Sequence, residues 1–327
     1  MRVGILYSRI RKDEKLLLNE LRDRGHEIEK IDVRKERFGL ESTTAAVDDL
    51  DLVVDRCLST SRSLYATRFL DSYGVPVVNS PETGDVCADK AKNSLALAEA
   101  DVPTPATEVA FTKEAALEAI ESFGYPCVLK PVTGSWGRLM AKIDSRNAAE
   151  AIVEHKETLG HYEHKVFYVQ EFVDKPGRDV RVLAVDGEPV AAMTRSSDHW
   201  LTNAAKGGET KSFDLDERAT ELVERASDAV GGGMLGVDLM EVGVDPDGDG
   251  AETGVDPDGD GAETGVDPDD DPAEGTADDY TVHEVNHTVE FKALDSATDV
   301  DVPARVVDWL EAKAAELADG AVAGVDA

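Results

Sequence analysis

The stretch YPCVLKPVTGSWGRLMAKI, residues 125–143, combines an apolar strand, a glycine-containing turn and a return strand. Lys130 stands at the end of the apolar strand, and a lysine among buried residues requires an anionic partner. The turn that follows contains Gly134 and Gly137, whose exposed backbone amides can bind phosphate. Such a turn alone is common in hairpins, so the phosphate hypothesis depends on the rest of the chain.

The segment before this stretch alternates strand and helix signals. Apolar or alternating strands fall at residues 2–8, 26–33, 50–54 and 75–80, and amphipathic helices fall at 13–25 and 63–73. This alternation of strands and helices predicts a small parallel-sheet domain over residues 1–86.

The remaining chain has a different pattern. Residues 87–168 alternate helices with short strands, and residues 169–327 are largely strands, with helices at 217–230 and 303–317. We therefore expect an architecture that is α/β in its first part and α+β in the other two, with boundaries after residues 86 and 168.

The chain is strongly acidic, with a formal net charge of −34. Residues 243–279 hold fifteen Asp or Glu and no Lys or Arg, yet the remainder still carries 53 acids against 34 bases. Molar salt shortens the Debye length to about 3 Å and screens such repulsion. We therefore expect a protein adapted to a salty cytoplasm, as in a halophilic archaeon. The charge also argues against nucleic acid as a partner.

The sequence contains no clear signal peptide, membrane span or cysteine motif. The chain has no run of eighteen apolar residues, and MRVGILYSRI is typical of a first strand rather than a signal peptide, so we expect a cytoplasmic protein that does not span a membrane. The three cysteines form no C-x-x-C pair, which supports neither a disulfide framework nor a zinc site.

An eleven-residue acidic unit, GVDPDGDGAET, occurs at 243–253 and again at 254–264, before a third, altered copy. Asp245, Asp247 and Asp249 resemble the start of a calcium loop, but the twelfth position holds Asp256 instead of Glu, and no helices flank it. Dense Asp, Gly and Pro favour a disordered insertion at the tip of a hairpin formed by residues 236–242 and 280–286. Specific calcium binding is the alternative.

That hairpin would bring Asp238 close to Glu284 and Asn286. Glu284 and Asn286 are two apart on a strand and project from one face. Two carboxylates and an amide oxygen suit Mg²⁺. The alternative is an ordinary solvated strand face.

Several motifs support a nucleotide site together. Lys90 opens a helix after Asp89, VQEFV at 169–173 offers a strand end that could pair with adenine, and Asp179 and Arg181 lie just beyond it. The motifs YSRIRKDEKLL, FGYPCVLKPVTGSWGRL, YVQEFVDKPGRDVRV, DHWLTNAAKGG and HEVNHTVEFK cover nearly the whole chain outside the insertion. In these motifs the chain resembles the ATP-grasp ligases of the RimK type, and among them the LysX/ArgX group. The resemblance implies an ATP-grasp fold with a small parallel-sheet, pre-ATP-grasp domain at the N-terminus. The acidic repeat is foreign to that family.

The resemblance implies ATP and Mg²⁺ as cofactors, with two metal ions bound. Mn²⁺ is the alternative to Mg²⁺. The nucleotide residues that it implies are Lys90, Lys130, Gly134, Ser135, Trp136, Gly137, Gln170, Glu171, Phe172, Val173, Asp179 and Asn203. The implied magnesium ligands are Asp238, Glu284 and Asn286.

Other residues are candidates for catalysis and substrate binding. Arg181 and Arg195 are expected to stabilise the charge that develops in a tetrahedral step. The candidates for substrate contacts are Arg9, Arg56, His199, Trp200, Lys206 and Gly207. Surface salt bridges for the two arginines, and a packed surface turn for His199 and Trp200, are the alternatives.

Enzymes of the LysX/ArgX group join an acidic amino acid to the C-terminal glutamate of the small acidic carrier LysW, through an acylphosphate, in lysine or arginine biosynthesis. TNAAKGG at 202–208 favours α-aminoadipate as the amino acid, whereas the halophilic setting favours glutamate, so both stay open. The resemblance also implies a homo-oligomer, either dimer or tetramer. Alternative functions are a RimK-type glutamate ligase with another protein or cofactor acceptor, and a non-catalytic, calcium-responsive binding module.

Overall fold

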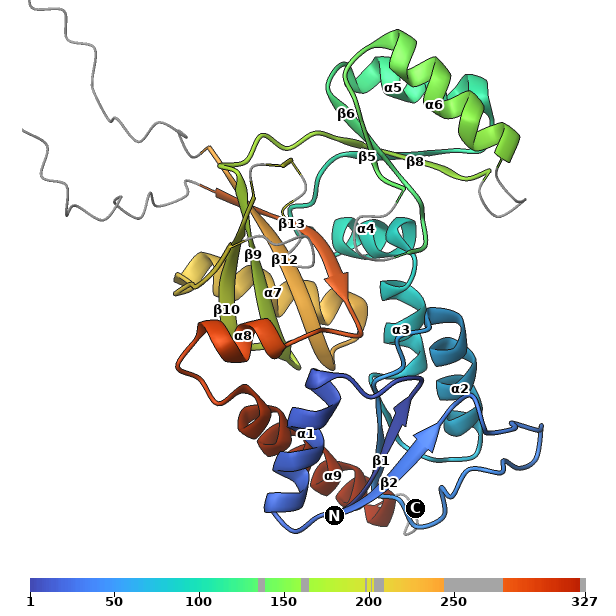
Figure 1. Cartoon of the computed structure of the whole chain (residues 1–327), viewed down its shortest axis with the longest axis vertical. Helices are drawn as coiled ribbons and strands as arrows, with labels where there is room; N and C mark the ends of the chain where they lie inside the picture. Colours follow the sequence, from blue (N-terminus) through green and yellow to red (C-terminus); the bar gives the residue numbers. More distant parts are fainter. Residues whose placement is uncertain are drawn as a thin grey trace, which may run out of the picture.

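The computed structural model describes residues 1–134, 139–159, 165–197, 199–200, 202, 209–243 and 279–323. Its N-terminal part is a parallel sheet in the order β2-β1-β3-β4. Its strands are β1 (Arg2–Tyr7), β2 (Glu27–Asp32), β3 (Leu52–Asp55) and β4 (Val77–Val78). Helix α1 (Lys12–Asp23) packs on one face and α2 (Thr60–Ser72) on the other (Figure 1). The predicted N-terminal parallel sheet is therefore confirmed.

The central part is reached through helices α3 (Pro81–Cys87) and α4 (Lys90–Glu99). It contains an antiparallel sheet in the order β5-β8-β6-β7, covered on one face by α5 (Lys113–Phe123) and α6 (Arg146–Leu159). The strands are β5 (Thr107–Ala110), β6 (Cys127–Lys130), β7 (Ala141–Ile143) and β8 (Phe167–Glu171). The stretch 125–143 thus supplies β6 and β7, as predicted.

The C-terminal part is an antiparallel sheet in the order β11-β10-β9-β12-β13, with α7 (Glu217–Val230) on one face. Its strands are β9 (Arg178–Val185), β10 (Glu188–Ser196), β11 (Glu209–Ser212), β12 (Met234–Val242) and β13 (Asp279–Asn286). The short helix α8 (Lys292–Ala297) and the last helix α9 (Val302–Ala323) follow. Although α9 is the last helix of the described residues, it packs against α1, so one core joins the first and last parts of the molecule (Figure 1).

Local signals explain several element ends. Helix α7 begins where the Asp216 side chain accepts a hydrogen bond from the Ala219 backbone N–H at 2.7 Å, and it ends at Gly231 in the left-handed region. The predicted strand at 75–80 shrinks to two residues because Ser80 caps α3, accepting a hydrogen bond from the Thr83 N–H at 3.1 Å. Helices α3 and α8 and strand β11 were not predicted.

The predicted hairpin is present. β12 and β13 pair antiparallel, with Val242 opposite Asp279 at the end of the hairpin from which the insertion extends. The acidic units between them, residues 244–278, lie outside the described residues, so the calcium hypothesis stays a prediction. None of the described helices is long and apolar enough to cross a membrane.

Candidate functional site

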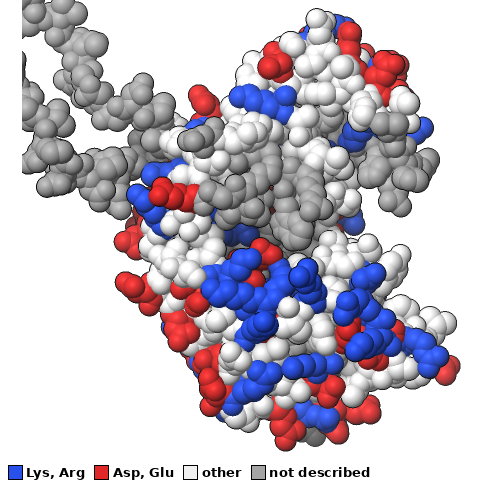
Figure 2. Space-filling view, in the orientation of Figure 1, with Lys and Arg blue, Asp and Glu red and all other residues white. Residues whose placement is uncertain are grey.

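A cleft of about 770 Å³ lies where the three parts meet. Figure 2 shows Lys and Arg side chains gathered in the middle of one face, while acidic side chains are frequent toward its edges. Most sequence-predicted site residues that the structure describes line this cleft. They are Lys90, Lys130, Gly134, Gln170, Glu171, Phe172, Val173, Asp179, Arg181, Arg195, Trp200, Asp238, Glu284 and Asn286.

Lys130, at the end of β6, is 3% exposed, and its Nζ is held by two neutral acceptors. It donates hydrogen bonds to Gln170 Oε1 and to His283 Nε2, the latter at 2.5 Å. Gln170 is itself fixed, because its Nε2 donates to the hydroxyls of Tyr168 at 2.8 Å and Thr107 at 2.9 Å. Burial lowers the pKa of Lys130 to about 7, although the charge of Glu284 opposes this shift.

Lys90, the first residue of α4, connects the glycine turn to β13. Its backbone N–H donates to the Val132 carbonyl at 2.8 Å, and its Nζ donates to the Gly134 carbonyl at 3.2 Å. The same Nζ lies 3.0 Å from the Glu284 carboxylate. One turn further along α4, the Asn93 side chain exchanges two hydrogen bonds with the Val285 backbone, at 2.8 and 3.2 Å. Helix α4 therefore holds β13 at two consecutive residues.

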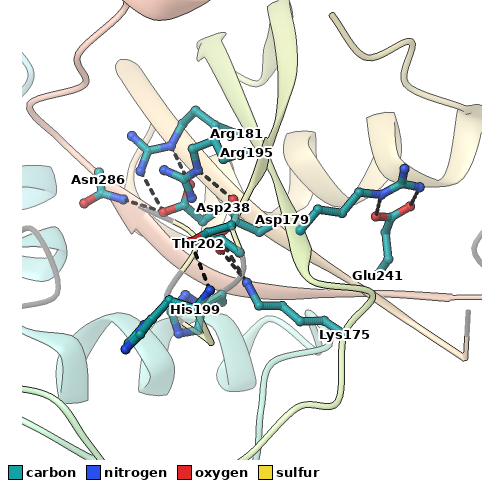
Figure 3. Close-up of polar contacts among 12 residues, drawn as sticks. Lys175, Asp179, Arg181, Arg195, His199, Thr202, Asp238, Glu241 and Asn286 are labelled. Carbon is teal, nitrogen blue, oxygen red and sulfur yellow. Dashed lines mark hydrogen bonds and ion pairs between the residues drawn. The ribbon is translucent and has the colours of Figure 1, made fainter. Parts of the chain in front are cut away.

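Asp238 of β12 is the centre of a buried ion-pair network (Figure 3). Its carboxylate accepts hydrogen bonds from Arg181 Nε and Nη2, the latter at 2.7 Å, and from Arg195 Nη2 at 3.0 Å. Arg195 Nε in turn donates to Asp179 Oδ1 at 2.6 Å. Burial acts to raise the pKa of Asp238, but the charges of Arg181 and Arg195 outweigh it and hold that pKa below its usual value.

Two residues of this network were missed from the sequence. Lys175 Nζ lies 3.5 Å from Asp179 Oδ2 and donates to Thr202 Oγ1 at 2.5 Å, while Thr202 donates to Asp179 (Figure 3). Burial lowers the pKa of Lys175. Lys175 precedes Asp179 by four residues in the motif YVQEFVDKPGRDVRV, and this short spacing could have indicated Lys175 from the sequence.

The predicted metal ligands meet at one edge of the cleft. Asp238 and Glu284 are direct partners across the β12–β13 ladder, and Asn286 Nδ2 lies 3.4 Å from Asp238 Oδ2. Both carboxylates already contact cationic side chains, and a half-turn of the Asn286 amide would present its oxygen instead. Within the described part of the chain, no three His, Cys, Asp or Glu side chains form a metal cluster. Two carboxylates with one amide oxygen nevertheless fit Mg²⁺ chemically.

Three other candidates, Arg9, Arg56 and His199, are not among the residues that line the cleft. Arg56 is 0% exposed, pairs with Glu14 at 3.4 Å and lies over the Phe291 ring, whereas Arg9 is exposed. The His199 ring lies next to Trp200, and the Trp200 ring lies 6.5 Å from that of Phe172, beside the predicted adenine hinge. Ser135, Trp136, Gly137, Asn203, Lys206 and Gly207 lie outside the described residues.

Comparisons with known proteins agree with this arrangement. Residues 3–86 match the LysX preATP-grasp domain, and residues 87–245 match the RimK-like ATP-grasp domain. The chain is 35% identical over 233 residues to the alpha-aminoadipate–LysW ligase LysX of Saccharolobus solfataricus, covering 71% of this chain and 84% of that protein. It is 29% identical over 313 residues to the glutamate–LysW ligase ArgX of Sulfolobus acidocaldarius, covering 95% and 98%.

A solved structure is also similar. The RimK domain protein ATP-grasp from Sphaerobacter thermophilus superposes with a TM-score of 0.71 at 28% identity, covering 94% of this chain and 99% of that one. The similarity thus extends over both the preATP-grasp sheet and the two ATP-grasp sheets that enclose the cleft.

Proposed function

Because the chain belongs to the RimK-like ATP-grasp ligases and carries a LysX preATP-grasp domain, we propose that it joins glutamate or α-aminoadipate to the C-terminal glutamate of a LysW-type carrier. ATP-grasp ligases use ATP and Mg²⁺ generally. The observation that carries the proposal is that two lysines and an Asp–Glu–Asn set, predicted from separate segments, line one cleft.

The two lysines, Lys90 and Lys130, are proposed to bind the ATP phosphates together with Gly134 and the turn residues Ser135, Trp136 and Gly137. For the adenine hinge the geometry favours Phe172 and Val173. Strand β8 ends at Glu171, and the Gln170 side chain is engaged by Lys130, so the base would pair with the backbone that follows. Asp179 and Asn203 complete the proposed nucleotide contacts.

Asp238, Glu284 and Asn286 would hold the metal, for which we propose two Mg²⁺ ions, replaceable by Mn²⁺. When bound there, the metal would neutralise phosphate charge. For binding to occur, Glu284 has to release part of its contact with Lys90 and Asp238 part of its contact with Arg181. Both cations would then be available to neighbouring anions, which makes metal and phosphate binding mutually supportive.

The proposed chemistry has two steps. The carrier carboxylate attacks the γ-phosphorus of ATP, which gives an acylphosphate and ADP, and the amino group of the amino acid then displaces phosphate and forms the amide. Arg181 and Arg195 are proposed to stabilise the tetrahedral oxyanion. Their pairs with Asp238 and Asp179 fix both guanidinium groups beside the metal ligands, which favours this role.

For the amino acid, we propose contacts from residues 199–207 and from the first part of the chain. Trp200 lines the cleft and is retained as a candidate with its neighbour His199, and Lys206 and Gly207 remain candidates from the sequence. Arg9 is exposed in the first part of the chain. Since Arg56 is enclosed by Glu14 and Phe291, we propose that it stabilises the packing of α1 on the C-terminal part instead.

A direct assay tests this function. The purified chain is incubated in molar KCl with ATP, Mg²⁺, a LysW-type carrier and either amino acid, and the carrier is weighed by mass spectrometry. We expect one amino-acid residue to be added, with ADP and phosphate released, and the mass identifies glutamate or α-aminoadipate. An unmodified carrier, with ADP release supported by a different protein or a cofactor acceptor, would favour the RimK-type alternative. Gel filtration of the same sample tests the proposed homo-oligomer.

A further inference from the structure

Strand β13 contains an irregularity at His283. Asp238 lies opposite Glu284, but the next residue of β12, Leu239, lies opposite Val282, so His283 has no partner across the ladder. One extra residue on a strand is a β-bulge, which changes the direction of the side chains around it. In a regular strand, His283 and Glu284 would face opposite sides of the sheet. Here both line the cleft.

The bulge brings the His283 ring to Lys130. Nε2 of His283 lies 2.5 Å from Nζ of Lys130, which belongs to the central sheet. When Lys130 is charged, its ammonium has only donors, so Nε2 of His283 is then the acceptor and the ring carries its proton on Nδ1. With Gln170 as second acceptor, two of the three N–H groups of Lys130 are used. The third has no hydrogen-bond acceptor among the described residues and is left for a ligand.

We infer that His283 is a positioning residue, which orients the Lys130 ammonium toward the nucleotide phosphates by accepting one of its hydrogen bonds. The inference rests on the proposed nucleotide site. A lysine side chain has a flexible four-carbon stem, so a single acceptor would leave its ammonium free to swing. Acceptors on β8 and on β13 fix it from two different sheets.

The contact also joins two sheets. Lys130 and Gln170 belong to the central sheet, whereas His283 precedes the proposed metal ligand Glu284 in the C-terminal sheet. His283, Glu284 and Val285 are thus held in succession by Lys130, Lys90 and Asn93. The first of these contacts acts on a residue proposed to touch phosphate, so its loss is expected to appear in nucleotide affinity.

Nucleotide binding without turnover tests the inference. The full chain is titrated with the non-hydrolysable analogue AMP-PNP and Mg²⁺ in a calorimeter. Removing an acceptor from a charged donor predicts about tenfold weaker binding or more for His283→Leu. His283→Gln keeps an acceptor and should recover most of the affinity. His26→Leu, in a histidine that contacts Glu311 far from the cleft, is the matched control and should bind normally.

A double-mutant cycle separates positioning from general damage. If His283 acts through Lys130, adding His283→Leu to Lys130→Met should weaken AMP-PNP binding no further. Additive losses, or a His283→Leu variant that binds as tightly as the unaltered chain, overturn the inference while leaving the nucleotide site intact. An unaltered chain that does not bind AMP-PNP overturns the proposed function as well. Should His283→Leu not fold, His283→Phe keeps a ring without the acceptor and is judged by the same outcomes.

Discussion

The ammonium of Lys90 lies 3.0 Å from the carboxylate of Glu284, and this ion pair connects the helix that opens the central part to the strand that carries two proposed metal ligands. Because Lys90 also contacts the carbonyl of Gly134, the glycine turn and the metal edge share one side chain. Phosphate binding and metal binding are therefore expected to depend on each other, and changes on either side should affect both.

Asp238→Asn should remove metal-dependent nucleotide binding and also destabilise the fold. The change leaves the buried Arg195 and the mostly buried Arg181 without the carboxylate that they share, and breaking a buried ion pair costs about 3–5 kcal/mol. Denaturant unfolding and AMP-PNP titration at several Mg²⁺ concentrations measure the two effects.

Glu241→Gln is the matched control for Asp238→Asn. Glu241 lies on the same strand, is 1% exposed and pairs with Arg178 at 2.6 and 2.8 Å, outside the cleft lining (Figure 3). It should lose stability but keep its Mg²⁺ dependence. Equal loss of Mg²⁺ dependence in both variants would contradict the assignment of Asp238 to the metal.

Asn93→Ala should weaken Mg²⁺-dependent binding without touching a ligand. Its side chain pairs both backbone groups of Val285, the residue between Glu284 and Asn286, and leaving buried backbone groups unpaired costs about 1–3 kcal/mol. Hydrogen exchange should show faster exchange of the Val285 amide. Leu97→Ala, in a fully buried residue of the same helix, should lose stability alone; if it shifts the Mg²⁺ dependence equally, Asn93 has no special role.

Nucleotide binding should take up a proton above pH 7. Burial lowers the pKa of Lys130 to about 7, so at pH 8 most of the free protein has a neutral Lys130. Nearby phosphates favour the charged form and return the pKa toward its ordinary value of about 10.4, so binding at pH 8 draws in up to one proton. Calorimetry of AMP-PNP binding in two buffers of different ionisation enthalpy measures this uptake. It should be small at pH 6 and absent in Lys130→Met, and a pH-independent value of zero would refute it.

The cleft could be anticipated from the sequence because several of its residues stand in segments with strong local signals. Lys130 ends an apolar strand, and Glu284 and Asn286 alternate on another, so pairing β12 with β13 brought them to Asp238. Helix α7 was predicted with its observed limits, since Asp216 and Gly231 mark its ends.

What the sequence could not predict depends on tertiary packing. The inward direction of His283 results from a bulge, and no local pattern around YTVHEVN indicates the extra residue. Arg56 follows a buried strand, as a ligand-binding residue would, but Glu14 and Phe291 from distant segments enclose it. Helix α3 was missed because Pro81 and Gly84 suggest a turn, whereas Pro at a first helical position is compatible with a helix.

The acidic units should be dispensable for the cleft. Val242 and Asp279 are opposite each other in the hairpin, so replacing residues 243–278 with Asn-Gly supplies a two-residue turn that suits the strand twist. The shortened chain should bind AMP-PNP and Mg²⁺ within about twofold of the full chain, because the proposed ligands on β12 and β13 keep their register. A shorter loop also costs less closure entropy, by about 0.6 kcal/mol per halving, so the fold should not be weakened. It should also need less KCl to stay folded, since fewer acids repel one another.

Adding Ca²⁺ to the full chain at fixed Mg²⁺ tests whether the acidic units have a role of their own. We expect no effect on affinity or activity. A change in either that disappears with the deletion would support the calcium-responsive alternative instead.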